Sequence, residues 1–520
     1  MRRILLKYTR RALFLLILVG VTFLGLRIYQ AESGPPLALW HTYVPKDLTA
    51  EEIDRADWAR YLAREARLMN DVRREVTQKL RDEERVAFNR YFDGAPIHPA
   101  RFAQDFNRSF ILEPDRAPVG AVVLLHGLTD APYSQRHIAR LYRDRGFLAV
   151  VIRMPGHGTV PAGLTEAVWE DWAAATRLAV REARRRVPAP APLHIVGFSN
   201  GGALAMNYAL DALGNPRLAR ADRIVLVSPM IGVTRFARYA GLAGLPSILP
   251  AFAKTAWLGI VPEFNPFKYN SFPVNGARQS YRATQILQSQ IVRESERLYR
   301  LPPVITFQSV MDFTVSTSAI VSGLYAHLPA NGSELVLFDV NRSEKFGLLL
   351  RPSAETAVER LLPAGARAYR TTVITSREDG VVEQSTEAGQ TVAQERALSV
   401  AFPPGLFSLS HVALPFPTSD ALYGLTPDPR EDFGVNLGTL MPRGERNVLI
   451  ASLDALLRVA SNPFFPYVAE RITQGIDAPV TTAPVALAAP APAAVPWWRQ
   501  FEPFIGWLFA PADDVADEPP

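Results

Sequence analysis

The chain has 520 residues, 48% hydrophobic and 21% charged, a composition that buries a large core and excludes a mainly disordered protein. It contains no cysteine, which excludes disulfides, a thiolate nucleophile and cysteine-based zinc sites. The net charge is +5, but residues 1–30 hold six basic and no acidic residues, so the remainder is close to neutral and no nucleic-acid footprint is expected.

The first 30 residues have the pattern of a signal anchor. Basic residues at positions 2, 3, 7, 10 and 11 precede an apolar run over 12–26. Continuing the run to Ile28, with the Arg27 side chain reaching the interface, makes it long enough to span a bilayer. The sequence around Ala31 is not a clear cleavage site, so we expect an uncleaved single-pass anchor. The basic flank predicts that the rest is extracytoplasmic, which means periplasmic if the protein is bacterial.

Residues 31–105 are expected to form a connector and an amphipathic helical segment. Thr49 and Glu52 have the spacing of a helix-capping box. Apolar residues then recur at helical spacing up to Leu80, which predicts one long helix between the anchor and the rest of the chain. The apolar positions are Trp58, Leu62, Met69, Val72, Val76 and Leu80.

Residues 106–475 are expected to form one α/β domain. Short apolar runs alternate with amphipathic segments, which predicts a mostly parallel sheet with helices on both faces. Functional sites in such sheets lie at the carboxyl ends of the strands. The predicted strands are 121–125, 148–152, 193–196, 224–227, 304–307 and 335–338.

Three stretches depart from this alternation. Residues 234–300 are rich in aromatic side chains and form an insertion, either a cap over the site or a structural unit with its own small core. Residues 341–401 form a second insertion with a predicted strand over 371–375. The sequence assigns no function to this insertion. Residues 476–520 are an Ala/Pro-rich linker and an aromatic tail, which suits a membrane interface, the body or a partner equally.

The pentapeptide from Gly197 to Gly201 reads G-F-S-N-G between a predicted strand and a predicted helix. This is the pattern of a nucleophile elbow, in which a serine on a tight turn projects its hydroxyl from the sheet. The flanking glycines leave room for the turn, and the following helix directs positive partial charge at the site. Ser199 is therefore the candidate nucleophile.

An elbow serine needs an acid and then a histidine later in the chain, each on a loop after a strand. Asp312 follows the predicted strand 304–307, and Asp339 is the substitute candidate. Of the two histidines beyond Asp312, His327 lies in a predicted helix, whereas His411 lies outside any strong periodicity. We therefore expect a triad of Ser199, His411 as the base and Asp312 as its orienting acid.

The oxyanion hole is expected to use two backbone N–H groups. One belongs to Asn200, directly after the nucleophile, and the other to Leu128, in the loop after strand 121–125. His126 and Gly127 are expected to support this loop.

Together, His126-Gly127, the R-M-P-G-H-G segment 153–158, the elbow, Asp312 and His411 resemble an α/β-hydrolase of the monoacylglycerol lipase, lysophospholipase and serine aminopeptidase-like branch. The resemblance covers about residues 110–340 and the segment around His411. It implies hydrolysis of an ester, or less often an amide, through an acyl-enzyme without a metal or organic cofactor. The spacing of nearly one hundred residues between Asp312 and His411 departs from the family pattern.

The leading hypothesis is a membrane-anchored serine hydrolase acting on a lipid or other small acyl ester; the sequence assigns no protein partner. A serine aminopeptidase or amidase is the enzymatic alternative, and it requires an anchor for a free amine. Glu263 is the candidate for that anchor, although a surface glutamate is the simpler interpretation. An inactive hydrolase fold used as a binding module is the third alternative.

Overall fold

The computed structural model describes residues 2–232, 241, 244–310, 312, 314–339, 357–377, 380–400, 409–438 and 461–478. The linker and aromatic tail after residue 478 lie outside the described residues, so the prediction for them stays a prediction. Residues 341–356, which are part of the insertion to which the sequence assigns no function, also lie outside the described residues.

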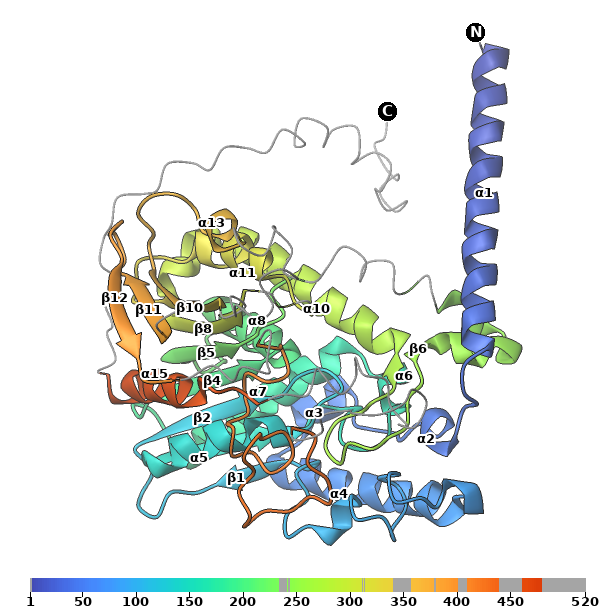
Figure 1. The fold of residues 1–520 in the computed structure, drawn as a ribbon, viewed down its shortest axis with the longest axis horizontal. Helices are drawn as coiled ribbons and strands as arrows, with labels where there is room; N and C mark the ends of the chain where they lie inside the picture. The colour runs from blue at the N-terminus through green and yellow to red at the C-terminus, as the bar shows by residue number, and fades with distance from the viewer. Residues whose placement is uncertain are drawn as a thin grey trace, which may run out of the picture. The chain divides into compact units, whose positions relative to one another are not determined.

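A ten-stranded sheet forms the centre of the described fold, in the order β1-β3-β2-β4-β5-β8-β9-β10-β11-β12 (Figure 1). The seven strands from β3 to β10 in this order run parallel, and β1, β11 and β12 are antiparallel to their neighbours. The strands are β1 (Phe110–Leu112), β2 (Gly120–Leu125), β3 (Phe147–Ile152), β4 (Leu193–Phe198), β5 (Arg223–Val227), β8 (Val304–Ser309), β9 (Glu334–Asp339), β10 (Arg370–Arg377), β11 (Gly380–Thr386) and β12 (Gln394–Leu398); a small separate hairpin pairs β6 (Trp257–Gly259) with β7 (Phe272–Pro273).

Every strand predicted from an apolar run is present, and the α/β class is confirmed. The central strands β2, β3, β4, β8 and β9 are buried along their whole length, because helices cover both faces. Strand β10 adds to β9 in parallel register, Thr371 facing Leu335. The described part of the second insertion therefore widens the sheet.

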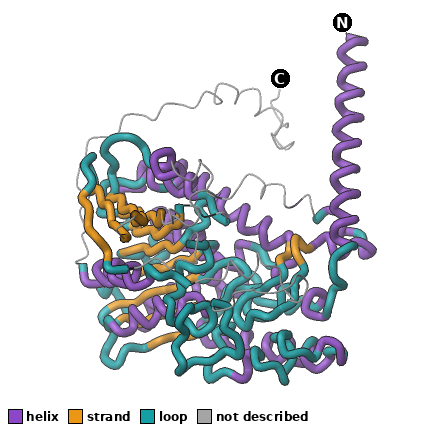
Figure 2. Tube along the Cα trace, in the orientation of Figure 1, coloured by secondary structure: helices purple, strands orange, loops and turns teal. Residues whose placement is uncertain are grey.

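Helices cover the two faces of this sheet in the manner of a layered α/β fold (Figure 2). Val123 of β2 packs in one core cluster with side chains of α7, α8 and α10. Its neighbour Val122 packs in the opposite cluster with Ile138 of α5 and Val468 of α15. The helices are α5 (Arg136–Asp144), α6 (Gly163–Glu166), α7 (Trp169–Arg186), α8 (Asn200–Gly214), α10 (Val274–Arg293), α11 (Thr317–Gly323), α13 (Ala357–Leu361) and α15 (Phe465–Asp477).

The N-terminal region differs from its prediction in two respects. The capping box is present, with the Thr49 N–H donating to Glu52 Oε2 at 2.9 Å, but the helix it starts is short. The helix ends after α3, and α4 begins at Trp58, capped by Asp57, whose carboxylate accepts from the Arg60 N–H at 2.7 Å. The expected single long helix is thus wrong. The helices are α1 (Arg2–Glu32), α2 (Leu39–Thr42), α3 (Ala50–Arg55) and α4 (Trp58–Glu75).

Helices α3 and α4 also do not separate the anchor from the body. Ile53, Trp58 and Tyr61 belong to the main core cluster, and the Tyr61 hydroxyl donates to the Arg153 carbonyl at 2.5 Å. Arg153 in turn forms buried ion pairs with Asp47 at 2.8 Å and Glu65 at 3.2 Å. The N-terminal segment is therefore built into the body of the α/β fold.

The 234–300 insertion contains two parts, a helix that packs in the main core and a preceding segment of short 3-10 helices. Its α10 is part of the main body, since Leu287 and Ile291 belong to the main core cluster. The segment before it contains short 3-10 helices, η6 (Leu245–Ile248) and η7 (Pro250–Ala256), which lie at the end of α1 (Figure 1). The helix α10 is therefore neither a lid over the site nor part of a structural unit with its own small core.

Candidate active site

Ser199 lies between the buried strand β4 and helix α8, at φ 54° and ψ −117°. Positive φ is uncommon for a residue other than glycine, and such strain is typical of functional turns. A Cβ atom on Gly201 would come within 2.2 Å of the Leu125 carbonyl oxygen, so the turn requires glycine there. The Ser199 N–H donates to the Val227 carbonyl at 3.0 Å. The local sequence thus folds into a strained elbow held by its neighbour β5.

Asp312 and His411 meet although 99 positions separate them. His411 Nδ1 lies 2.8 Å from Asp312 Oδ2. The second oxygen, Asp312 Oδ1, accepts from the N–H groups of Thr314 at 2.8 Å and Val315 at 3.0 Å. Burial alone would raise the pKa of Asp312, but the His411 contact and these N–H groups outweigh it and lower that pKa. The carboxylate is therefore charged near neutral pH.

The ring of His411 packs against the residue that precedes Ser199. Its centroid lies 5.4 Å from that of Phe198, and the His411 side chain is 8% exposed. His327, by contrast, lies in the short 3-10 helix η9 (Tyr325–His327) between α11 and β9. The structure thus brings His411 to the elbow from a distant part of the chain.

The loop after β2 lies directly against the elbow. A Cβ on Gly127 would come 3.1 Å from the Ser199 Cβ, so glycine permits this close approach. His126 Nε2 accepts from the Met154 N–H at 3.0 Å, which leaves the Nδ1 proton for the Gly127 carbonyl at 2.9 Å. Burial lowers the pKa of His126 well below its usual range, so the ring stays neutral in this role.

Sequence reasoning missed two residues of the insertion that hold this loop. The Tyr269 N–H donates to the Thr129 carbonyl at 2.7 Å, and Lys268 Nζ donates to Thr129 Oγ1 at 3.1 Å. Thr129 itself has φ 61°. Leu128, the expected oxyanion donor, is half-buried next to Thr129.

Asn200, the other expected donor residue, is 1% exposed and begins α8. Its side-chain Oδ1 accepts from the Ser280 hydroxyl of α10 at 3.0 Å. This bond occupies the amide side chain and ties α10 to the first turn after the elbow. No motif in the sequence indicated Ser280.

A buried charge cluster holds the segment that carries His411. Asp420 Oδ2 accepts from Arg136 Nη1 and from His137 Nε2, the latter at 2.8 Å, and Oδ1 accepts from the Tyr133 hydroxyl at 2.9 Å. Burial lowers the pKa of His137 to about 4, so its neutral ring donates this bond at neutral pH. Burial opposes ionisation of Asp420, but Arg136 holds its pKa below the usual range. Arg136 and Asp420 are 1% and 0% exposed.

An aromatic cluster completes this support. Tyr133 stacks on Phe267 with centroids 4.4 Å apart, and Phe433 packs edge-on against both rings. Phe416 and Tyr423, from the same segment as His411, lie in this cluster. These contacts explain how a histidine so far along the chain is fixed beside the elbow.

Glu263 does not lie on the surface, and that expectation is wrong. It is 1% exposed, and its two carboxylate oxygens accept from the N–H groups of Asn270 at 3.0 Å and Ser271 at 2.8 Å. Burial raises its pKa. Its acceptors serve the fold of its own loop, so it offers no free anchor for an amine.

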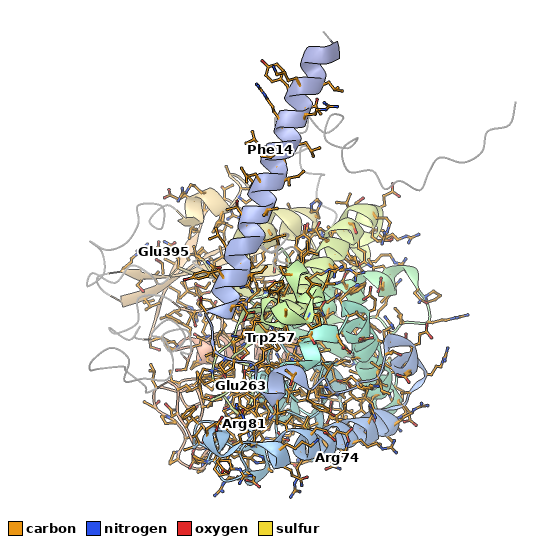
Figure 3. All side chains as sticks on the ribbon, turned by 90° about the vertical axis from the view of Figure 1, so that its right-hand side faces the viewer. Phe14, Arg74, Arg81, Trp257, Glu263 and Glu395 are labelled. Atoms are coloured by element: carbon orange, nitrogen blue, oxygen red, sulfur yellow. The ribbon has the colours of Figure 1, made fainter. Side chains whose placement is uncertain are left out.

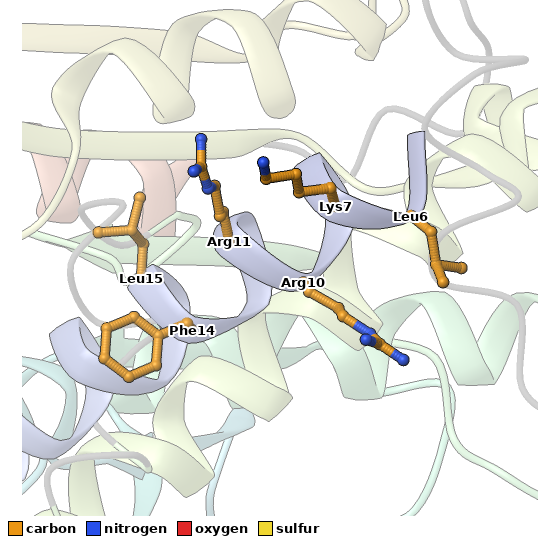
Figure 4. A pocket seen from close by; sticks show the side chains of 6 residues that line it. All are labelled: Leu6, Lys7, Arg10, Arg11, Phe14 and Leu15. Carbon is orange, nitrogen blue, oxygen red and sulfur yellow. The ribbon is translucent and has the colours of Figure 1, made fainter. Parts of the chain in front are cut away.

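The pocket drawn in Figure 4 is separate from this site. The described residues that line it all belong to α1, and they include no serine, histidine or carboxylate.

The parallel sheet and the elbow define an α/β-hydrolase fold. Residues 116–301 match the family described as serine aminopeptidase, S33. A thermostable monoacylglycerol lipase from Bacillus sp. (strain H-257) is 30% identical over 134 residues, which are 25% of this chain and 52% of the relative. The chain thus spans about half the length of this curated relative. The matched region is similar to α/β-hydrolases of the serine aminopeptidase and monoacylglycerol lipase branch.

Solved structures that match just under half of this chain include lipolytic enzymes and monoacylglycerol lipases. A structure from the work on LipS and LipT, two metagenome-derived lipolytic enzymes, is 21% identical, with a TM-score of 0.35, over 49% of this chain and 97% of the other. A soluble variant of the Saccharomyces cerevisiae monoglyceride lipase is 16% identical, with a TM-score of 0.35, over 44% and 81% of the two chains. The Paleococcus ferrophilus monoacylglycerol lipase is 17% identical, with a TM-score of 0.33, over 49% and 97%.

Proposed function

We propose that this protein is a membrane-anchored serine hydrolase that cleaves carboxylic esters of lipids or other acyl compounds. The observation that carries the proposal is the Asp312–His411 pair, two residues 99 positions apart in the chain that meet beside the strained elbow of Ser199. A hydrolase fold that serves only as a binding module would not need a histidine bonded to a buried carboxylate beside the elbow. The inactive binding module is therefore the weaker alternative.

The proposed reaction has two steps. His411 takes the proton of the Ser199 hydroxyl, the oxygen attacks the ester carbonyl, and the leaving alcohol departs with that proton. Water then attacks the acyl-enzyme, with His411 again as the base, and frees Ser199. Asp312 keeps the imidazole oriented and stabilises its charged form. The N–H groups of Asn200 and Leu128 bind the oxyanion, aided by the N-terminus of α8.

Two observations favour esters over amides. The curated relative is a monoacylglycerol lipase, and Glu263, the candidate for binding a free amine, is buried with both oxygens engaged. We therefore place the aminopeptidase activity second, although the family description names it.

The anchor is proposed to be α1. It contains a span over Leu6–Glu32, with a mean hydropathy of 2.2 in its most apolar window and none of that window buried. Lys7, Arg10 and Arg11 project from its first turns (Figure 4), so we propose that this end stays cytoplasmic and that the hydrolase body lies on the other side. Contacts of the last turns of α1 with the body support its retention as an anchor over its removal as a signal sequence.

The substrate class is tested with p-nitrophenyl esters of graded chain length and aminoacyl p-nitroanilides. We expect kcat/KM for the best ester to exceed that for the best anilide by at least about 10²-fold, because Glu263, the candidate for binding the amine, is buried with both oxygens engaged. The His411→Ala variant is the control for enzyme-dependent turnover. A preference for anilides would contradict the ester assignment and restore the aminopeptidase.

A further inference from the structure

The end of α1 is clamped to the 234–300 insertion. The Arg27 guanidinium donates to the carbonyl groups of Thr255, at 3.4 Å, and Trp257. Lys254 Nζ donates to the carbonyl groups of Glu32 at 3.2 Å and Gly34 at 3.1 Å. The Arg27 side chain of α1 donates to the insertion, and the Lys254 side chain of the insertion donates to the end of α1 and the residues just after it. Together these bonds hold the last turns of α1 against η7 and β6.

This clamp sets where a bilayer surface lies on the body. The hydrocarbon core is about 30 Å thick and a helix rises about 1.5 Å per residue, so a span of about 20 residues that starts near Arg11 ends near Ala31, with the long Arg27 side chain reaching the interface. Figure 3 shows Phe14 on the part of α1 that extends clear of the body, and Trp257 near the foot of the helix. The residues that contact this foot lie at the level of the lipid headgroups.

An exposed apolar surface lies in this same segment. Ile248 is 79% exposed and Leu249 58% exposed, at the end of η6, which packs against η7. Leu245 and Leu258 are 47% and 42% exposed. We call these four residues the apolar patch. The sequence 244–262 contains one charged residue, Lys254, and Lys254 is already used in the clamp.

We propose that the apolar patch inserts into the lipid leaflet in which α1 ends. Water contact with four large aliphatic side chains is unfavourable, and the clamp places them where lipid removes that contact. The bilayer then holds the insertion against its surface, so an acyl ester reaches the hydrolase from lipid. This inference rests on the proposed anchoring by α1 and adds a second contact with the membrane.

The absence of cysteine allows a direct test. Single cysteines replace Ile248, Leu16 of α1 or Val392, which lies on the loop before β12 and is 76% exposed, a close match to Ile248. Each full-length variant is labelled with the fluorophore NBD in phosphatidylcholine/phosphatidylglycerol vesicles. Lipids with nitroxides on the acyl chain then quench any probe that lies in lipid.

We expect strong quenching at Leu16→Cys and Ile248→Cys, with the Ile248 probe quenched severalfold more than the Val392 probe. Quenching at position 16 combined with equal responses at 248 and 392 would overturn the patch proposal and leave the anchor intact. No quenching at position 16 would overturn the anchor and the patch together.

Activity gives a second readout. Ile248→Glu with Leu249→Glu is expected to lower the rate on a long-chain ester embedded in vesicles by about tenfold, since charged groups resist entry into lipid. The rate on soluble p-nitrophenyl acetate is expected to stay within about twofold. Val392→Glu is the matched control. Equal losses on both substrates, or no loss on either, would contradict insertion.

Discussion

Asp312→Asn is expected to lower kcat on an ester substrate by about 10⁴-fold, because an amide no longer selects the reactive tautomer of His411 or stabilises its charged form. The two residues are bonded at 2.8 Å in a buried position, so water cannot replace the lost carboxylate. Steady-state kinetics of the purified full-length protein in detergent measure the effect.

Asp339→Asn is the matched comparison, since Asp339 ends the neighbouring strand β9 and was the other acid that the sequence offered. We expect it to keep kcat within about threefold of wild type, as for a residue outside the reacting set. Thermal unfolding of both variants separates loss of chemistry from loss of fold. A larger effect at Asp339 than at Asp312 would contradict the assigned acid.

Asp420→Ala is expected to lower the free energy of unfolding by about 3–5 kcal/mol, because it leaves the Arg136 guanidinium buried without its carboxylate partner. It also removes acceptors for Tyr133 and for the Leu422 and Tyr423 N–H groups. Urea unfolding in detergent measures the change. Since the same segment carries His411, kcat is expected to fall even at temperatures where the variant stays folded.

The control is Asp115→Ala, in an exposed loop, where a change within about 0.5 kcal/mol is expected. An Asp420→Ala variant as stable as this control would mean that the buried cluster does not hold the segment in place.

The core of the fold was predictable because its signal is local. Central strands such as β2 and β4 are buried on both faces, so they read as continuous apolar runs. Strands β11 and β12 were not predicted, because these last two strands of the sheet carry charged residues among their apolar ones. Glu383 of β11 and Arg396 of β12, for example, pair across the two strands at 2.9 Å. The break between α3 and α4 had a local signal in Asp57, a favourable N-cap, which the longer apolar pattern obscured.

Only part of the candidate active site could be predicted from the sequence. The elbow is a local motif, and the order of acid and histidine narrowed the remaining choices to a few residues. The contacts that hold His411 join residues as distant as Arg136 and Asp420, and no periodicity reports such pairs. Glu263 shows the opposite error: a lone glutamate suggests the surface, but the backbone N–H groups of its own loop bind it inside the protein.

The most direct test of the account is labelling of the full-length protein with a fluorophosphonate, followed by mass spectrometry of the modified peptide. The reagent bonds to an activated serine oxygen, so we predict one adduct at Ser199, no adduct in Ser199→Ala, and much slower labelling in His411→Ala. A control hydrolase verifies the reagent. A wild-type protein that stays unlabelled, or is labelled at another serine, would contradict the assignment of Ser199 as the nucleophile.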